Sequence, residues 1–335
     1  MRSLQLLGDA RAEIRDVPDP EPPQGGVVVA LRASAICGSE LEAYRASEIP
    51  PDLSNLGHEA VGVVVDASRS RRWRVGDRVG VHAVWGCGNC AECAAGRYTY
   101  CVRRTVQVGA HAELMAAPDH VLLPLPDDAD FAVGTLLTGD TLGVPYHANA
   151  RLRVSEAQFL AVVGCGPIGL ASILFHAYRG ARVIAFDPRA ERRSLAEGAG
   201  AEAAIDPRAE DPAAAVRART RGRLADVSIE ASGTSAGVAL ALSLVGPGRP
   251  VALCGEARAV TLDVSRDLLR QDRAVFGSWY YHYAEYPEML AIWRGGLQLR
   301  ELITDRFPFV EAPDALAAFA SGATGKVVLE IAEAS

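Results

Sequence analysis

Hydrophobic and polar residues follow one pattern in the first part of the chain and another in the second. Up to about residue 140, short apolar runs alternate with turn residues, as at 27–31 and 60–65, which is typical of β-strands and leaves little helix. From residue 159 onward, short apolar strands alternate with helical segments. We expect the strands at 159–163, 181–186, 201–205, 225–230, 250–255 and 274–280, and helices at 170–178, 190–197 and 212–219. The pattern predicts a mostly-β domain and an α/β domain with a doubly wound parallel sheet.

The boundaries of the two domains follow from where the pattern changes. Residues 141–158 are predicted to form the helix that leads out of the first domain. Near the end of the chain, 302–304 and 327–331 have the apolar character of strands that return to it. We therefore expect the mostly-β domain to comprise 1–141 and 282–335, and the α/β domain to comprise 142–281.

A glycine-rich turn follows the first α/β strand. The segment 164–169 reads Gly-Cys-Gly-Pro-Ile-Gly and passes straight into an apolar helix, which is the context that a dinucleotide-binding turn requires. Its first glycine permits the tight turn, the second lets a pyrophosphate approach the backbone, and the third lets the helix pack closely on the strand. The helix N-terminus offers free N–H groups to the phosphates. The expected cofactor contacts in this turn are Gly164, Gly166, Pro167, Ile168 and Gly169.

The second α/β strand ends in a carboxylate that bears on the choice of cofactor. Asp187 can accept hydrogen bonds from both hydroxyls of an adenosine ribose, and it repels the 2′-phosphate of NADP. Arg189 is the opposing feature, because a guanidinium two residues on could fold over and accept that phosphate. The loop 231–233 follows the fourth strand, and Ser232 within it is a further expected contact. We predict NAD as the cofactor.

Composition and charge exclude several classes of protein. With 49% hydrophobic and 22% charged residues in 335, the chain is typical of a soluble globular protein. The net charge of −7 argues against nucleic acid as a partner. Residues 157–175 are almost long enough to cross a bilayer, but glycine and proline interrupt them, so no membrane partner is expected. The apolar run at the start is too short for a signal peptide, which predicts a cytoplasmic protein. Lys326 is the only lysine, and we interpret the bias toward arginine as GC-rich coding rather than as a binding surface.

Four closely spaced cysteines form the strongest chemical signal. They are arranged C-x₂-C-x₂-C-x₇-C within 86–102. In a reducing compartment four thiolates this close fit one tetrahedral zinc better than disulfides, and the alternatives are an iron–sulfur cluster and accidental clustering. A site filled by four protein ligands is structural. The predicted ligands are Cys87, Cys90, Cys93 and Cys101.

A second, sparser group comprises Cys37, His58 and Glu59. A thiolate and an imidazole suit zinc, and a site with fewer than four protein ligands leaves a position for a water or a substrate oxygen. Such residues more often serve packing, so the group is weak evidence by itself. Ser39 is either a hydroxyl relay beside this site or a turn residue.

Together these features resemble the zinc-dependent medium-chain alcohol dehydrogenases, the group that includes sorbitol/iditol and threonine dehydrogenases. The resemblance extends over nearly the whole chain and includes Thr-Gly-Lys-Val-Val at 324–328. It implies a GroES-like catalytic domain, a Rossmann domain, a catalytic zinc, and a homodimer or homotetramer. The matching positions are 37–39, 57–59, the four-cysteine lobe, 164–169 and Asp187.

One departure from that family and one position that varies within it bear on catalysis. Glu42 stands three residues after Ser39, where many relatives have a relay histidine. The last ligand of the catalytic zinc varies in the family. Asp140, in Leu-Thr-Gly-Asp at 137–140, is the candidate here, and Glu59 is the competing carboxylate.

An oxidoreductase is the function that these residues predict. We expect hydride transfer between NAD and a small alcohol or ketone, specifically a secondary alcohol of polyol or cyclitol type. The expected catalytic residues are Cys37, Ser39, His58 and Glu42. The alternatives are a biosynthetic carbonyl reductase of the same family and a non-catalytic nucleotide-binding protein. The aromatic run at 279–286 is predicted to line either a subunit interface or the substrate mouth.

Overall fold

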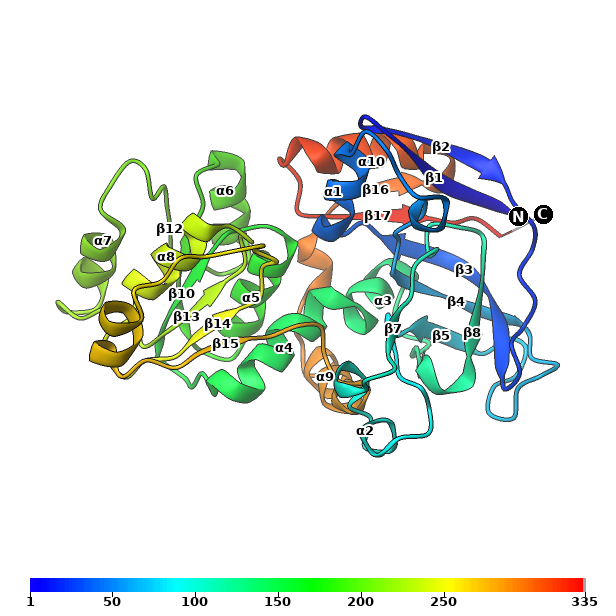
Figure 1. Cartoon of the computed structure of the whole chain (residues 1–335), viewed down its shortest axis with the longest axis horizontal. Helices are drawn as coiled ribbons and strands as arrows, with labels where there is room; N and C mark the ends of the chain where they lie inside the picture. The colour runs from blue at the N-terminus through cyan, green and yellow to red at the C-terminus, as the bar shows by residue number, and fades with distance from the viewer. Residues whose placement is uncertain (334–335) are drawn as a thin grey trace. The chain divides into compact units, whose positions relative to one another are not determined.

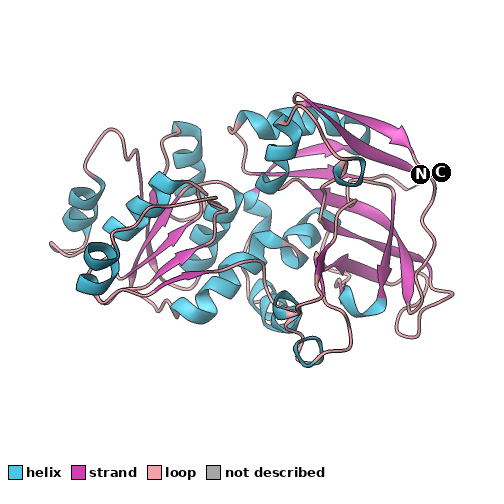
Figure 2. Cartoon of the chain, viewed as in Figure 1, coloured by secondary structure: helices cyan, strands magenta, loops and turns pink. Residues whose placement is uncertain are grey.

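The computed structural model describes residues 1–333, and these form two compact units (Figure 1). Unit 1 comprises Met1–Gly143, Tyr280–Trp293 and the described part of Ile303–Ser335. Unit 2 comprises Val144–Trp279 and Arg294–Leu302. Strands dominate unit 1, whereas helices and strands alternate in unit 2 (Figure 2).

Unit 1 is built on a seven-stranded sheet with the order β16-β17-β3-β4-β5-β9, in which β8 also pairs with β3. All of its pairs are antiparallel except β16 with β17. The central strand β3 is almost wholly apolar and buried, which explains its length. The strands are β3 (Gly26–Ala35), β4 (Glu59–Asp66), β5 (Arg78–Val81), β8 (Leu114–Pro118), β9 (Leu122–Pro124), β16 (Ile303–Pro308) and β17 (Lys326–Glu330).

Smaller elements surround this sheet. Two further sheets of two strands each are formed by β1 (Arg2–Gly8) with β2 (Arg11–Asp16), and by β6 (Val84–Trp85) with β7 (Thr105–Val106). Unit 1 contains α1 (Leu41–Arg45), α2 (Ala91–Ala94), α3 (Phe131–Thr138) and α10 (Ala312–Ser321), and it shares α4 (Asp140–Leu152) and α9 (Tyr286–Arg294) with unit 2. The sequence did not predict α3, because seven of its eight residues are buried and a helix buried on all sides lacks an amphipathic period.

Short helical turns complete the chain. One of them, η1 (Gly38–Glu40), immediately follows Cys37. The others are η2 (Pro51–Leu53), η3 (Tyr98–Tyr100), η4 (Asp119–Val121), η5 (Val264–Leu268), η6 (Leu269–Gln271), η7 (Tyr283–Glu285), η8 (Leu299–Leu302) and η9 (Phe309–Glu311).

Unit 2 contains a six-stranded sheet with the order β12-β11-β10-β13-β14-β15, and every pair in it is parallel. This confirms the predicted doubly wound parallel sheet. The chain order reverses between β10 and β13, and a reversal of this kind is where such sheets bind nucleotides. The elements are β10 (Phe159–Val163), α5 (Pro167–Tyr178), β11 (Arg182–Phe186), α6 (Ala190–Gly198), β12 (Ala203–Ile205), α7 (Pro212–Arg219), β13 (Val227–Glu230), α8 (Ser235–Ser243), β14 (Val251–Leu253) and β15 (Val275–Gly277).

The core of unit 2 shows why β10 is apolar throughout. Phe159, Ala161 and Val163 pack with residues of α7 and α8 on one face of the sheet. The alternate residues Leu160 and Val162 are equally buried on the other face. The long apolar stretch of the sequence therefore divides into β10 and α5. Among the described residues, no helix combines the length and apolar character needed to cross a membrane.

Candidate active site and metal centres

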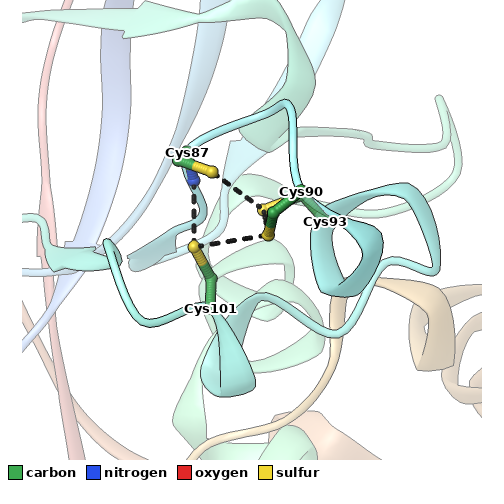
Figure 3. Close-up of side chains that lie close together, drawn as sticks. All are labelled: Cys87, Cys90, Cys93 and Cys101. Atoms are coloured by element: carbon green, nitrogen blue, oxygen red, sulfur yellow. Dashed lines mark hydrogen bonds between the residues drawn. The ribbon is translucent and has the colours of Figure 1, made fainter.

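The four predicted cysteines meet in one lobe of unit 1, with their sulfur atoms turned toward one another (Figure 3). The Sγ atoms of Cys90 and Cys93 lie 3.5 Å apart, those of Cys90 and Cys101 3.8 Å, and those of Cys87 and Cys93 3.9 Å. Four thiolates bound tetrahedrally to one zinc at about 2.3 Å stand about 3.8 Å from one another. The spacing therefore fits a single tetrahedral ion.

The surroundings of this lobe explain how the chain brings four thiols together. Gly86 stands where a Cβ would come within 2.5 Å of the Cys93 sulfur, so only glycine leaves room for that side chain. A backbone hydrogen bond from Asn89 is the main cause that lowers the pKa of the Cys87 thiol to about 6. Burial raises the pKa of the Cys93 thiol to about 12. An ion bound here would displace the proton from Cys93, so metal binding should strengthen as the pH rises.

A second cluster in unit 1 unites Cys37, His58, Glu59 and Asp140, whose ligand atoms all lie within 4.8 Å of one another. Cys37 follows the end of β3, His58 and Glu59 stand at the start of β4, and Asp140 is the first residue of α4. Asp140 Oδ2 lies 3.5 Å from the Cys37 sulfur and 3.3 Å from His58 Nε2. Three separate segments thus direct one sulfur, one nitrogen and one oxygen toward a common point.

His58 is oriented for metal binding by its own backbone. Its Nδ1 lies 2.9 Å from the Leu56 carbonyl oxygen, which can only accept, so Nδ1 carries the hydrogen. Nε2 is thereby the nitrogen available to a metal. Burial lowers the pKa of His58, but its bonds to Asp140 and Cys37 outweigh burial and place the pKa well above the ordinary value. A metal ion at this point would take the place of that proton.

The two carboxylates of the cluster differ in their hydrogen bonds. Glu59 is fully buried and pairs through Oε1 with the ammonium of Lys326, which is also buried. Its Oε2 accepts a hydrogen bond of 3.4 Å from Thr141 Oγ1. In Asp140, by contrast, the buried Oδ1 has no hydrogen-bond partner among the described residues. A buried carboxylate oxygen without a partner is costly, and a cation beside it would remove that cost. The residues present therefore fit a zinc ion bound by Cys37, His58 and Asp140.

The carboxyl edge of the unit 2 sheet carries the predicted nucleotide-binding residues. Gly164 has a φ of +90°, and a Cβ there would meet Ser232 N at 2.6 Å, so the ends of β10 and β13 lie side by side at the chain reversal. At Gly169 a Cβ would meet the Gly164 carbonyl oxygen at 1.8 Å, which explains why the helix needs glycine there. A Cβ on Gly166 would meet only Arg192, at 3.8 Å, so this backbone is open to a ligand.

Asp187 lies at the same edge of the sheet, directly after the end of β11. Its Oδ2 accepts the Cys165 N–H at 2.9 Å, and its Oδ1 accepts the Arg189 N–H at 2.9 Å. These bonds hold the carboxylate beside the glycine turn, and an ionised carboxylate has further lone pairs for ribose hydroxyls. Arg192 also faces this turn, where its Nη1 donates to the Cys165 carbonyl at 3.1 Å.

Comparison with known proteins agrees with this geometry. The alcohol dehydrogenase GroES-like domain model matches residues 23–127, and the zinc-binding dehydrogenase model matches 167–294. YphC, an uncharacterized zinc-type alcohol dehydrogenase-like protein of Escherichia coli (strain K12), is 32% identical, and the match covers 98% of each chain. The chain belongs to the zinc-type medium-chain alcohol dehydrogenase family. L-threonine 3-dehydrogenase of Symbiobacterium thermophilum is 30% identical over 98% of this chain and 97% of its own.

A solved structure in the same family has the same fold. Alcohol dehydrogenase TADH from Thermus sp. ATN1 gives a TM-score of 0.90 at 27% identity, covering 99% of this chain and 100% of that one. The predicted family is confirmed, and so is the fold class, a GroES-like domain with a Rossmann-type domain. As a member of this family, the protein is an oxidoreductase.

Ser39 and Glu42, the two residues expected to take part in proton transfer, lie at the surface. Ser39 is an exposed residue of η1, two positions after Cys37. Glu42 is an exposed residue of α1 and stands outside the cluster of metal-binding groups. Their participation in proton transfer therefore stays a prediction.

The aromatic run after β15 contains both buried and exposed residues. Tyr280 and Tyr281 are buried in unit 1, where their rings pack at 4.8 and 4.7 Å from the ring of His82. Burial lowers the pKa of His82 to about 4. Trp279, the neighbouring residue, is exposed and belongs to unit 2. The two buried tyrosines pack within unit 1, and the assignment of the run to a subunit interface or to the substrate mouth stays a prediction.

Sequence reasoning missed three buried polar residues that contact the metal-binding segments: Glu40, His111 and Lys326. Lys326 is the only lysine of the chain and lies in the Thr-Gly-Lys-Val-Val motif of the family resemblance, but the sequence does not indicate its partner. Its pairing with Glu59 joins positions 267 residues apart. The replacement of lysine by arginine everywhere else was the available signal that position 326 has a specific requirement.

Proposed function

We propose that the protein oxidises a secondary alcohol of polyol or cyclitol type, with NAD as the hydride acceptor and a zinc ion held by Cys37, His58 and Asp140. The convergence of these three side chains, with an unpartnered buried oxygen on Asp140, is the observation that carries the proposal. A second zinc held by the four cysteines would be structural. The relative named L-threonine 3-dehydrogenase supports a secondary alcohol as the substrate, because carbon 3 of threonine bears a secondary hydroxyl.

The residues of the proposed site would balance the charge of the zinc ion and transfer the substrate proton. Zinc supplies Lewis-acid polarisation of the substrate oxygen, and NAD supplies the hydride acceptor. Cys37 and Asp140 provide two negative charges, which balance a divalent cation. Lys326 neutralises Glu59, so the third acidic group adds no net charge to the site. Ser39 would take the proton of the substrate hydroxyl toward solvent.

Activity and metal content together test the proposal. The purified protein should contain two zinc ions per chain and should reduce NAD with at least one member of a panel of secondary alcohols and polyols, followed at the nicotinamide absorbance. One zinc per chain and no activity with the panel would favour the non-catalytic alternative.

We further propose that the protein is a cytoplasmic homo-oligomer, a dimer or a tetramer, with the domain boundaries expected from the sequence.

NAD should be preferred over NADP by at least about 100-fold in kcat/KM. A 2′-phosphate placed beside the Asp187 carboxylate would meet repulsion worth roughly 3 kcal/mol. Asp187→Asn should reduce the preference, because it removes the charge and keeps the side-chain size. Arg189→Ala, which removes the guanidinium that could accept the phosphate, should not reduce the preference. Equal kcat/KM values for the two cofactors in the native protein would refute this assignment.

Ser39→Ala should lower kcat by about 100-fold, because it removes the hydroxyl expected to receive the substrate proton. Glu42→Gln should lower kcat by about tenfold and remove one break from its pH profile, if the carboxylate replaces the histidine of many relatives. Both residues are exposed, so neither change should disturb folding. Measuring kcat against pH for each variant separates them. An unaltered profile for Glu42→Gln would mean that Ser39 passes its proton to water or the cofactor ribose instead.

A further inference from the structure

A buried series of hydrogen bonds connects the Cys37 segment to His111, a residue with no assigned role. The N–H of Cys37 donates to Glu40 Oε1 at 2.8 Å, and Glu40 Oε2 lies 2.8 Å from His111 Nε2. The other ring nitrogen of His111 lies 2.8 Å from Ser34 Oγ. Because a carboxylate only accepts, Nε2 carries the hydrogen. Ser34, Glu40 and His111 are each at most 1% exposed, so solvent does not reach this network.

The same histidine also contacts the segment that leads to His58. Asn55 Oδ1 accepts the N–H groups of Gly57 and His111 at 3.2 and 3.3 Å, and Asn55 Nδ2 donates to the His111 carbonyl at 2.9 Å. The N–H of Ala110 donates to the Gly57 carbonyl at 2.8 Å. A Cβ on Gly57 would come within 2.6 Å of the His111 ring, so the imidazole packs directly on the peptide next to His58.

The polarity of this network argues for a role in positioning. Burying a carboxylate with an imidazole costs desolvation that an apolar pair would avoid, and such pairs are weak evidence of stabilisation alone. Here the pair connects two segments that are distant in sequence, since His111 and Glu40 are 71 residues apart. One end of it fixes the backbone of Cys37, and the other end fixes the peptide before His58.

We propose that His111 is a positioning residue of the metal centre, which acts through Glu40 on Cys37 and through Asn55 and Gly57 on His58. It sets the spacing between the thiolate and the imidazole that a zinc ion requires. The inference rests on the proposed zinc site at Cys37, His58 and Asp140. Groups that orient metal ligands in this way typically change metal affinity by 10- to 100-fold when they are removed.

The test is the rate at which each zinc leaves the full-length protein to an excess of chelator. His111→Phe fills the same space but has no hydrogen-bond donor. Zinc should leave the Cys37 site of this variant about 10- to 100-fold faster than in the native protein, whereas the rate of loss from the four-cysteine site should be unaltered. Because His111→Phe leaves a buried carboxylate unpaired, the double variant His111→Phe/Glu40→Gln is measured as well. His111→Gln retains a donor for Glu40 and should restore most of the slow release.

With Co²⁺ in place of zinc, the absorption bands of the Cys37 site should shift in the Phe variants.

Leu123→Ala is the matched control, because it removes buried side-chain atoms from β9, a strand of the same unit that pairs with β5 and contains none of the metal-binding residues. It should leave both release rates and the cobalt spectrum as in the native protein. Native release rates and cobalt spectra in both Phe variants would overturn the inference, and so would equally rapid release from Leu123→Ala. If the native protein and Cys37→Ser bind the same amount of metal, the proposed function itself is overturned instead.

Discussion

Cys37→Ala should reduce kcat/KM for the alcohol substrate by at least about 1,000-fold and remove one of two zinc ions, while the protein stays folded. In the proposed site the thiolate would be one of three ligands, with a further position left for substrate, so its loss should release the ion. Without Lewis-acid polarisation, several kcal/mol of transition-state stabilisation disappear, and each 1.4 kcal/mol corresponds to about tenfold in rate. Steady-state kinetics, zinc analysis and circular dichroism on the same sample measure all three effects.

Cys93→Ala provides the contrast, because its thiol belongs to the closed site. The buried Cys93 sulfur lies 3.5 Å from that of Cys90, and the lobe around them contains little regular structure. Zinc bound by the four cysteines would therefore contribute to the folding of this lobe, and its loss should lower the melting temperature or disturb assembly. A Cys93→Ala protein that lacks one zinc but melts like the native protein would show that the lobe does not depend on its metal. A Cys37→Ala protein with native activity would contradict the assignment of the catalytic site.

Features that depend on neighbouring residues were predictable from the sequence. The glycine turn, the alternation of strands and helices in unit 2 and the four-cysteine lobe each occupy one short stretch, where spacing alone implies geometry. The position of β10 and the bounds of α7 agree with the structure to the residue. Helix α3 was missed because its residues are buried on nearly every side, so its sequence has no polar face to reveal a period.

Contacts between distant segments could not be predicted in the same way. The choice between Glu59 and Asp140 depends on Lys326, the first residue of β17, whose ammonium contacts Glu59 from the far end of the chain. The hydrogen bond between His111 and Glu40 likewise depends on the sheet of unit 1. In both cases a buried polar residue has its partner on another element, and neither local propensity nor spacing contains that information.

Lys326→Met should lower the free energy of unfolding by about 3–5 kcal/mol at neutral pH, because it leaves the Glu59 carboxylate buried without its cation. Lys326 is 1% exposed and Glu59 is 0% exposed, so water cannot replace the lost partner. Denaturant unfolding of the native and variant proteins measures the difference. The double variant Lys326→Met/Glu59→Gln removes both charges and should recover most of the lost stability. Glu59→Gln alone should be destabilising, because it leaves the Lys326 ammonium buried without its carboxylate.

The dependence of this loss on pH distinguishes an unpaired carboxylate from a packing defect. Burial raises the pKa of Glu59, and Lys326 is the largest influence that lowers it, so the pKa should rise further in Lys326→Met. A carboxyl with a higher pKa in the folded than in the unfolded protein binds more protons when folded. Its stabilising contribution is therefore complete below the unfolded pKa of about 4.3 and is lost as the pH rises through the folded pKa. The deficit of Lys326→Met should thus be smallest near pH 5 and largest near pH 8. A deficit of the same size at both pH values would mean that Lys326 matters for its packing and not for its charge.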